Sequence, residues 1–158
     1  MAKKVLSEKF YLEMKKIEGR YPTKVALMLP ALHMAQDENS WLSPEVLDAV
    51  AEYLDVHPAQ VCEVASFYTM FNLNPVGKYH LKICTNVSCC LRGSNEIVKY
   101  CENKLGISCG ETTKDNKFTL SEEECLGACG TAPAMMLNND YCEKLSMEKV
   151  DRLLDRLT

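Results

Sequence analysis

The sequence predicts an α/β fold in two parts, a helical bundle over residues 1–74 and a domain with a small mixed sheet and flanking helices over residues 75–158. Apolar residues recur at helical spacing throughout the first part. After the turn at residues 74–77 the period changes to strand-like alternation. The rest of the chain then shows the order strand, helix, strand, strand, helix, which is typical of a small mixed sheet covered by helices.

The first two helices are predicted from an apolar stripe and a continuous apolar run. Gly19 is expected to end the first helix, and the second is expected to begin near Thr23. From residue 24 to residue 36 apolar side chains lie almost all round the helix, which indicates burial among other helices. Pro30 is expected to kink this helix or mark its end. The stripe of the first helix consists of Leu6, Phe10 and Ile17.

Two further helices are predicted from their starting residues. Ser43 is a suitable N-cap, Pro44 suits the first turn, and the helix is expected to run to about Leu54. His57 and the proline after it open another helix, which is expected to run to about Phe71. The first part therefore holds four predicted helices before any strand.

The second part is expected to begin with a half-buried strand over residues 79–84. A helix with Gly106 as its stop follows, with an apolar face formed by Ile97, Val98, Cys101 and Leu105. Further strands are predicted at residues 117–120, 134–137 and 141–145, the last two as a hairpin through 138–140. Ser146 should cap a final helix whose core stripe consists of Val150, Leu153, Leu154 and Leu157.

Composition limits the classes of function. The 158 residues carry a net charge of −4, and residues 25–77 contain seven carboxylates and no Lys or Arg. A helix-turn-helix DNA reader, which the helices at 45–68 resemble in outline, would need cations on its binding face, so no nucleic acid partner is expected. The longest apolar stretch, residues 25–35, contains Pro30 and His33 and is too short to span a membrane, so no direct membrane insertion is expected.

The cysteines point to a metal centre in a reducing compartment. The chain begins without an apolar secretory segment, and its nine cysteines are an odd number, so metal ligands and buried free thiols are expected instead of a disulfide framework. Four of them form a C-x4-C pair, Cys84 and Cys89, and a C-x3-C pair, Cys125 and Cys129. Two short loops with two thiolates each can enclose a 2Fe-2S core.

The surroundings of these four cysteines favour an anionic cluster. Cys84 ends the predicted strand and Cys89 lies where the next helix is expected to begin, so backbone N–H groups of a helix N-terminus would face the site. The second loop, residues 125–133, has two glycines and small side chains, which allow the backbone to wrap close to the sulfurs, and Pro133 closes it.

Two other kinds of site remain open. A structural zinc protein with four cysteine ligands would use the same thiolates, although zinc knuckles usually hold tighter pairs, so the spacing favours iron. A thioredoxin-type oxidoreductase would need a C-x-x-C pair, which Cys84 and Cys89 do not form. The three histidines are isolated in sequence and are expected to be structural.

The remaining cysteines are expected to lie outside the cluster. Cys62 and Cys101 lie on predicted helices and are interpreted as buried thiols. Cys109 and Cys142 are either buried thiols or a redox pair, and Cys90 is interpreted as a bystander next to a ligand.

Four aromatic residues in the first part are candidates for contact with a protein partner, and core packing is the alternative for each of them. These are Trp41, Phe67, Tyr68 and Phe71.

An ordered motif extends this pattern to a known family. The motif is Asp115-x2-Phe118-Thr119-x5-Cys125-Leu126-Gly127-x-Cys129-x2-Ala132-Pro133, and residues 20–36, 63–86 and 90–93 add to it. It resembles the E subunit of bacterial NADH:quinone oxidoreductase, the small 2Fe-2S subunit of the NADH-oxidising module of complex I. The resemblance implies a thioredoxin-like 2Fe-2S ferredoxin domain after the helical bundle, with the cluster on Cys84, Cys89, Cys125 and Cys129.

The resemblance also implies a partner and a reaction. In the family, FMN and the NADH site belong to a larger subunit that also carries a 4Fe-4S cluster, within a proton-translocating complex. The cluster of the small subunit takes one electron from the reduced flavin, as a side store. The chain would lie in the cytoplasm, on the cytoplasmic face of the inner membrane, through its partners. Similar modules serve NAD-linked hydrogenases and formate dehydrogenases, so an equivalent diaphorase subunit is the alternative.

Overall fold

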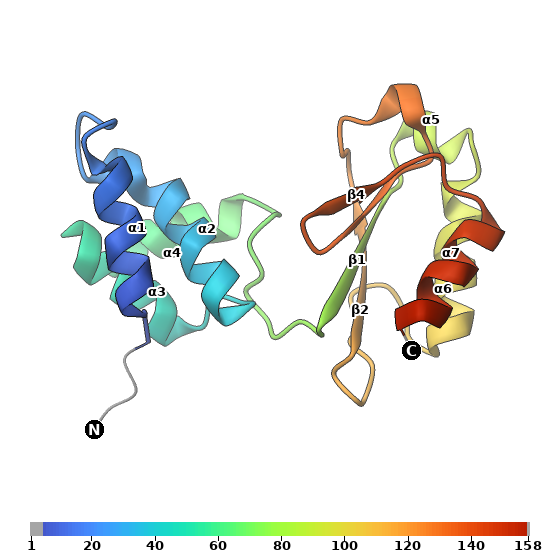
Figure 1. The fold of residues 1–158 in the computed structure, drawn as a ribbon, viewed down its shortest axis with the longest axis horizontal. Coiled ribbons are helices and arrows are strands. Elements are labelled where there is room, and N and C mark those ends of the chain that lie inside the picture. Colours follow the sequence, from blue (N-terminus) through green and yellow to red (C-terminus); the bar gives the residue numbers. More distant parts are fainter. Residues whose placement is uncertain (1–4, 158) are drawn as a thin grey trace. The chain divides into compact units, whose positions relative to one another are not determined.

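The computed structural model describes residues 5–157, and the chain divides into two compact units between Pro75 and Val76 (Figure 1). The first unit contains helices, and the second contains a four-stranded sheet with helices against it. The predicted α/β class is therefore confirmed. None of the helices within residues 5–157 has the length and apolar character of a membrane span.

Over its described residues, 5–75, the first unit is a bundle of four α-helices and one 3-10 turn. Ser7 caps the first helix by accepting a hydrogen bond from the backbone of Phe10 at 3.3 Å, and Gly19 ends it as predicted. Apolar side chains from every helix meet in one core, among them Phe10, Leu32, Val50 and Val61. The elements are α1 (Glu8–Glu18), η1 (Val25–Leu27), α2 (Met28–Asn39), α3 (Pro44–Leu54) and α4 (Pro58–Phe67).

Pro30 does not end its helix, so the prediction of a helix end there was wrong. The chain forms a 3-10 turn first, and α2 begins only at Met28. Pro30 is then the third residue of α2, where the missing N–H would have had no partner within the helix. The helix continues without interruption to Asn39.

The third helix has the predicted bounds, whereas the fourth ends at Phe67 instead of near Phe71. The chain turns away at Tyr68, which has an extended backbone. Gln36 on α2 holds the departing segment, because its side chain donates to the carbonyl of Met70 at 2.9 Å and accepts from the N–H of Asn72 at 2.6 Å. These bonds replace those that a longer α4 would have made.

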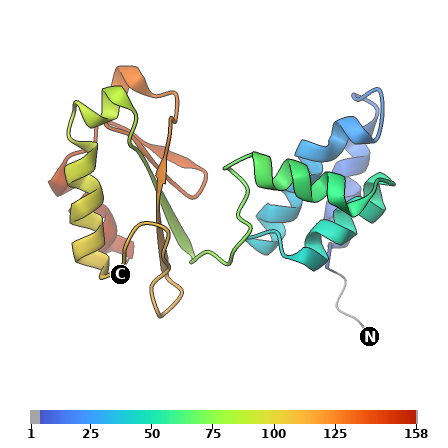
Figure 2. The ribbon, with the colours of Figure 1, turned by 180° about the vertical axis from the view of Figure 1, so that it is seen from behind.

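The second unit holds a sheet with the strand order β2-β1-β3-β4. β1 pairs parallel to β2 and antiparallel to β3, and β3 pairs antiparallel to β4. The long helices α6 and α7 lie together on one face of this sheet (Figures 1 and 2). The elements are β1 (Tyr79–Cys84), α5 (Val87–Cys90), α6 (Ser94–Leu105), β2 (Phe118–Glu123), η2 (Cys129–Thr131), β3 (Met135–Leu137), β4 (Asp140–Cys142) and α7 (Met147–Leu157).

Three predictions about the strands need correction. β2 runs three residues further than expected, to Glu123, because it stays paired with β1 as far as Cys84. β4 ends at Cys142, and Leu145 is a core residue beyond it. β1 is not half-exposed: His80 is buried opposite the core residues Leu81 and Ile83, and its ring nitrogen lies 2.9 Å from the hydroxyl of Ser121.

The packing of α6 on α7 combines apolar and ionic contacts. Ile97, Val98 and Cys101 of α6 share a core with Val150 and Leu154 of α7. At the edge of this contact Lys104 forms ion pairs with Asp151 and Asp155, the second at 2.6 Å, and Tyr100 donates to Asp151. The helix pair therefore has a fixed position over the sheet that carries Cys84.

We expect Gly77→Ala to destabilise the protein. The N–H of Gly77 donates to the hydroxyl of Thr119 at 2.7 Å, and a Cβ at this position would lie 2.9 Å from backbone atoms of Lys117 and Phe118. Overpacking of this kind costs about 1–3 kcal/mol of unfolding free energy, which urea denaturation would measure. Gly19→Ala is the control, because its Cβ would meet nothing within 4 Å. Equal effects of the two substitutions would contradict the predicted clash.

Candidate metal centre

The first two candidate ligands lie at the end of β1 and in the short helix after it. Cys84 is the last residue of β1 and Cys89 is the third residue of α5, and both are buried. The strand end is held from both sides, because Cys84 donates its N–H to the carbonyl of Ala134 at 3.1 Å and Thr85 donates to Glu123 at 3.0 Å.

The helix expected to begin at Cys89 is organised differently from the prediction. α5 starts at Val87 and is a single turn, and the long helix α6 starts only after Gly93, which has a φ of 87°. Cys89 therefore lies inside a one-turn helix. The macrodipole of a single turn is small, so individual backbone N–H groups, not a helix dipole, provide the polar environment of the sulfurs.

The second pair belongs to the loop that connects β2 to β3. Cys125 and Cys129 are both exposed, and Cys129 begins the 3-10 turn η2. Hydrogen bonds from the segment at 141–145 hold this loop in place. Tyr141 donates its hydroxyl to the carbonyl of Leu126 at 2.9 Å, and Lys144 donates its N–H to Thr131 at 2.7 Å. Sequence spacing could not reveal these contacts, because they come from the far side of the β3–β4 hairpin.

The two candidate pairs lie near each other at this edge of the sheet. Cys84 lies close enough to Cys89 and Cys125 for their thiols to affect its pKa, and Cys129 affects the pKa of Cys89. Ala132 and Leu126 pack against Cys84 and Cys89 and form a small apolar cluster. The site thus has a buried side, with Cys84 and Cys89, and an exposed side, with Cys125 and Cys129.

The two buried thiols have different pKa values. Burial acts to raise the pKa of Cys84, but hydrogen bonds from the backbone of Asn86 and Leu126 and from the neighbouring thiols outweigh it and lower the pKa. The pKa of Cys89 is raised, first by burial and then by its hydrogen bond to Cys84, against a lowering effect of the Ala134 backbone. Cys84 is therefore the first thiolate of the pair.

The donor set fits a 2Fe-2S group. Backbone N–H groups of Asn86 and Leu126 reach Cys84, that of Ala134 reaches Cys89, and that of Gly127 donates to the sulfur of Cys125 at 3.3 Å. Such bonds stabilise the negative charge on thiolate ligands. Within residues 5–157, no three His, Cys, Asp or Glu side chains are arranged to hold one metal ion. A two-iron core has another requirement, because its four thiolates are shared between two irons.

The other five cysteines differ from one another in exposure. Cys101 is buried as predicted, whereas Cys62 is exposed on α4, so the interpretation of Cys62 as a buried thiol was wrong. Cys62 lies off the face that carries the buried Val61 and Ala65. Cys90 is exposed beside Cys89, and its sulfur accepts a hydrogen bond from Asn95 at 3.3 Å. Cys109 and Cys142 are half-buried, and all nine cysteines are free.

The three histidines have structural contacts. His57 caps α4 by accepting from the N–H of Ala59 at 3.2 Å, and the ring of His33 packs on Phe71 at a centroid distance of 5.0 Å. Burial lowers the pKa of His80 to about 4, with a smaller contribution from Lys82, so this side chain is neutral at pH 7.

A family model agrees with this site over most of the chain. The model for thioredoxin-like [2Fe-2S] ferredoxins matches residues 14–158, which include both loops and most of the helical bundle. The chain belongs to this family. The expected resemblance to respiratory E subunits is confirmed by relatives, and the fold of a thioredoxin-like ferredoxin preceded by helices agrees with the structure described above.

Relatives of this ferredoxin include named respiratory subunits. The E subunit of NADH-quinone oxidoreductase from Rickettsia prowazekii is 50% identical over 140 residues, which are 87% of this chain and 79% of that protein. Its counterpart from Rickettsia conorii is 49% identical over 87% of this chain and 84% of that protein. The mitochondrial NADH dehydrogenase [ubiquinone] flavoprotein 2 of Dictyostelium discoideum is 45% identical over 92% of this chain and 60% of that protein.

A solved structure shares the fold of this ferredoxin. An NAD+-reducing [NiFe]-hydrogenase in its H2-reduced state aligns with a TM-score of 0.74 at 24% identity. The match takes in 83% of this chain and 22% of the hydrogenase chain.

We expect the five cysteines outside the candidate cluster site to differ in their reaction with iodoacetamide at pH 8. Cys101 should react last, because it is buried and burial raises its pKa to about 12. Burial also raises the pKa of Cys109, to about 11. Cys62 and Cys90 should react first, because they are exposed. Peptide mass spectrometry of the native protein would give the order, and modification of Cys101 at the rate of Cys62 would contradict it.

Proposed function

We propose that this chain is the one-electron carrier subunit of the NADH-oxidising module of an NADH:quinone oxidoreductase. Its 2Fe-2S cluster would be held by Cys84, Cys89, Cys125 and Cys129 and would exchange electrons with FMN on a partner subunit. The observation that best supports the proposal is the match to the thioredoxin-like [2Fe-2S] ferredoxin family, in a chain whose two cysteine loops, far apart in sequence, lie near each other. Relatives about 50% identical are E subunits of NADH-quinone oxidoreductase.

The chain's own residues would bind the cluster and form the polar and apolar surroundings of its sulfur ligands. When bound, a 2Fe-2S cluster supplies a carrier for a single electron. The four cysteine sulfurs would be the ligands, and the N–H groups of Asn86, Leu126, Gly127 and Ala134 would donate to them. Ala132 and Leu126 would keep water from the buried sulfurs. These features favour iron-sulfur over the alternative of a structural zinc ion.

The exposed side of the site supports electron exchange with another protein. Cys125 and Cys129 are open to solvent, and two large apolar side chains of the first loop are exposed nearby in sequence, Val87 by 68% and Leu91 by 82%. Exposed apolar side chains next to a redox site are typical of a docking face. The partner would be the flavin-bearing, NADH-binding subunit with a 4Fe-4S cluster, because this sequence has neither a G-x-G-x-x-G loop nor a C-x2-C-x2-C run.

The assignment of domains and location follows from the same proposal. Residues 1–74 would form a helical domain and residues 75–158 the cluster domain. The complete complex would place the chain on the cytoplasmic face of the inner membrane through its partner subunits.

The equivalent diaphorase subunit of an NAD-linked hydrogenase or formate dehydrogenase is the second candidate. The likeness to the hydrogenase at 24% identity concerns the fold, whereas the identity to the respiratory E subunits is about twice as high.

We expect the purified protein to contain about two irons and two acid-labile sulfides per chain, the content of a 2Fe-2S core with four cysteine ligands. Alanine in place of Cys84, Cys89, Cys125 or Cys129 should abolish the EPR signal of the dithionite-reduced protein, because each removes one thiolate ligand. Cys90→Ala is the matched control and should retain the signal. One equivalent of zinc without sulfide, or loss of the signal in the Cys90 variant, would overturn the ligand assignment.

Reduction by NADH tests the proposed partner. The reduced-cluster EPR signal should appear when NADH is added to this chain together with the flavin-bearing subunit of the same organism, and not when NADH is added to this chain alone. Reduction without the flavin subunit would contradict the proposal. Isolation of the endogenous chain then separates the two host complexes, because it should co-purify with quinone-reducing membrane subunits and not with a hydrogenase.

A further inference from the structure

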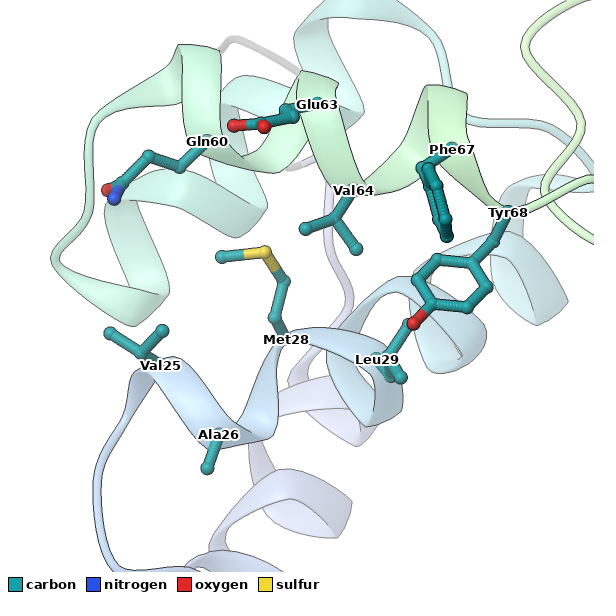
Figure 3. A pocket seen from close by; sticks show the side chains of 9 residues that line it. All are labelled: Val25, Ala26, Met28, Leu29, Gln60, Glu63, Val64, Phe67 and Tyr68. Atoms are coloured by element: carbon teal, nitrogen blue, oxygen red, sulfur yellow. The ribbon is translucent and has the colours of Figure 1, made fainter.

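An apolar groove lies in the helical unit, between the segment of η1 and the start of α2 on one side and α4 on the other (Figure 3). Its volume is about 550 Å³. Figure 3 shows Met28 and Val64 in the middle of the groove, Val25 toward one end, and the rings of Phe67 and Tyr68 at the other. The lining residues are Val25, Ala26, Met28, Leu29, Gln60, Glu63, Val64, Phe67 and Tyr68.

The walls of this groove are apolar side chains that the bundle does not bury. Phe67 is 76% exposed and Val25 is 53% exposed. The rings of Phe67 and Tyr68 meet edge to face, with centroids 5.0 Å apart, so each supports the position of the other. Of the four candidate anchors in the sequence, Phe71 packs in the core and Trp41 is half-buried. Phe67 and Tyr68 therefore remain as the candidates for contact with a partner.

The exposure of the walls favours a protein segment over a small molecule. A small ligand in the groove would leave most of the Phe67 ring and the Val25 side chain in water. A protein segment across the groove would cover both walls, and burial of exposed apolar area is what drives such association. Met28 on the floor has a flexible side chain, which adapts to an inserted apolar group.

Charge defines the chemistry of the partner. Glu63 is the only acidic or basic side chain among the lining residues that the structure describes. The groove also lies within residues 25–77, which hold seven carboxylates and no Lys or Arg. A complementary surface therefore carries Lys or Arg beside its apolar residues. The same face of a second copy would repel this one, and none of the lining residues offers a cation to nucleic acid or to an anionic lipid surface.

We propose that this groove docks an apolar segment flanked by Lys or Arg on the flavin-bearing partner subunit. The proposal rests on the function proposed above and adds a second contact, made by the helical unit independently of the cluster ligands. The apolar side chains of the partner segment would insert between Val25 and Phe67 over Met28, and its cations would face Glu63. The helical unit would in this way contribute to binding while taking no part in electron transfer.

Site-specific photo-crosslinking identifies the occupant. p-Benzoylphenylalanine would replace Phe67 in the full-length chain, co-expressed with the flavin-bearing subunit. Irradiation should join the two subunits, and peptide mapping should place the link in an apolar segment with adjacent Lys or Arg. The same probe at Leu12, which is 62% exposed on α1 and does not line the groove, should give no such link. A link to a second copy of this chain, or equal links from both positions, would overturn the proposal.

Binding of the two purified subunits gives the energetic test. Phe67→Ala should raise the Kd at least about 10-fold, the effect of losing an aromatic anchor. Glu63→Lys should raise it by a similar factor at low salt, and less at high salt. The controls Leu12→Ala and Glu52→Lys should stay within about 2-fold, because both residues are exposed outside the groove.

The EPR signal of the cluster distinguishes this proposal from the proposed function. Every variant should retain the signal, because the substituted residues all lie in the helical unit and the four cysteines lie in the second unit. If the unaltered chain fails to bind the flavin subunit, the proposed function fails. If it binds and the Phe67 and Glu63 variants bind equally well, the groove is not the docking site and the proposed function stands.

Discussion

The pairing of β1 with β2 and with the segment before β3 is the constraint on which the metal centre depends. Cys84 and Thr85 donate their N–H groups to Ala134 and Glu123, which lie on opposite sides of the strand end. These two bonds bring together loops that are separated by 35 residues of chain, including α6. Without this pairing the C-x4-C and C-x3-C segments would be two unrelated loops. With it, the two loops lie near each other at the edge of the sheet.

The same arrangement makes the site asymmetric. Cys84 and Cys89 are buried against Ala132 and Leu126, while Cys125 and Cys129 remain exposed. An electron carrier needs both conditions, because burial and N–H donors hold a charged cluster and an exposed side permits exchange with another protein. The exposed loop is nevertheless held in place by hydrogen bonds from Tyr141 in β4 and Lys144 just after it. Access to the site therefore does not require a loose loop.

Local signals predicted most elements, and they failed where distant residues intervened. The caps at Ser43 and His57 are short-range and gave correct helix starts. The end of α4 was predicted too late, because the side chain of Gln36, on another helix, hydrogen-bonds with the backbone of Met70 and Asn72 after α4. The burial of Cys62 was also misjudged, because the face that a helix turns to the core depends on its neighbours.

The sequence by itself determined the α/β class, the change from helices to a sheet near Pro75, and the four candidate ligands, since spacing, period and motif are properties of the chain alone. The tertiary structure decided which sulfurs are buried, how the thiols differ in pKa, and that the second loop is held by residues in and just after β4. It also decided that Phe67 and Tyr68 line a groove while Phe71 joins the core. Exposure, electrostatics and surface shape arise from contacts between distant segments, and local sequence patterns do not specify those contacts.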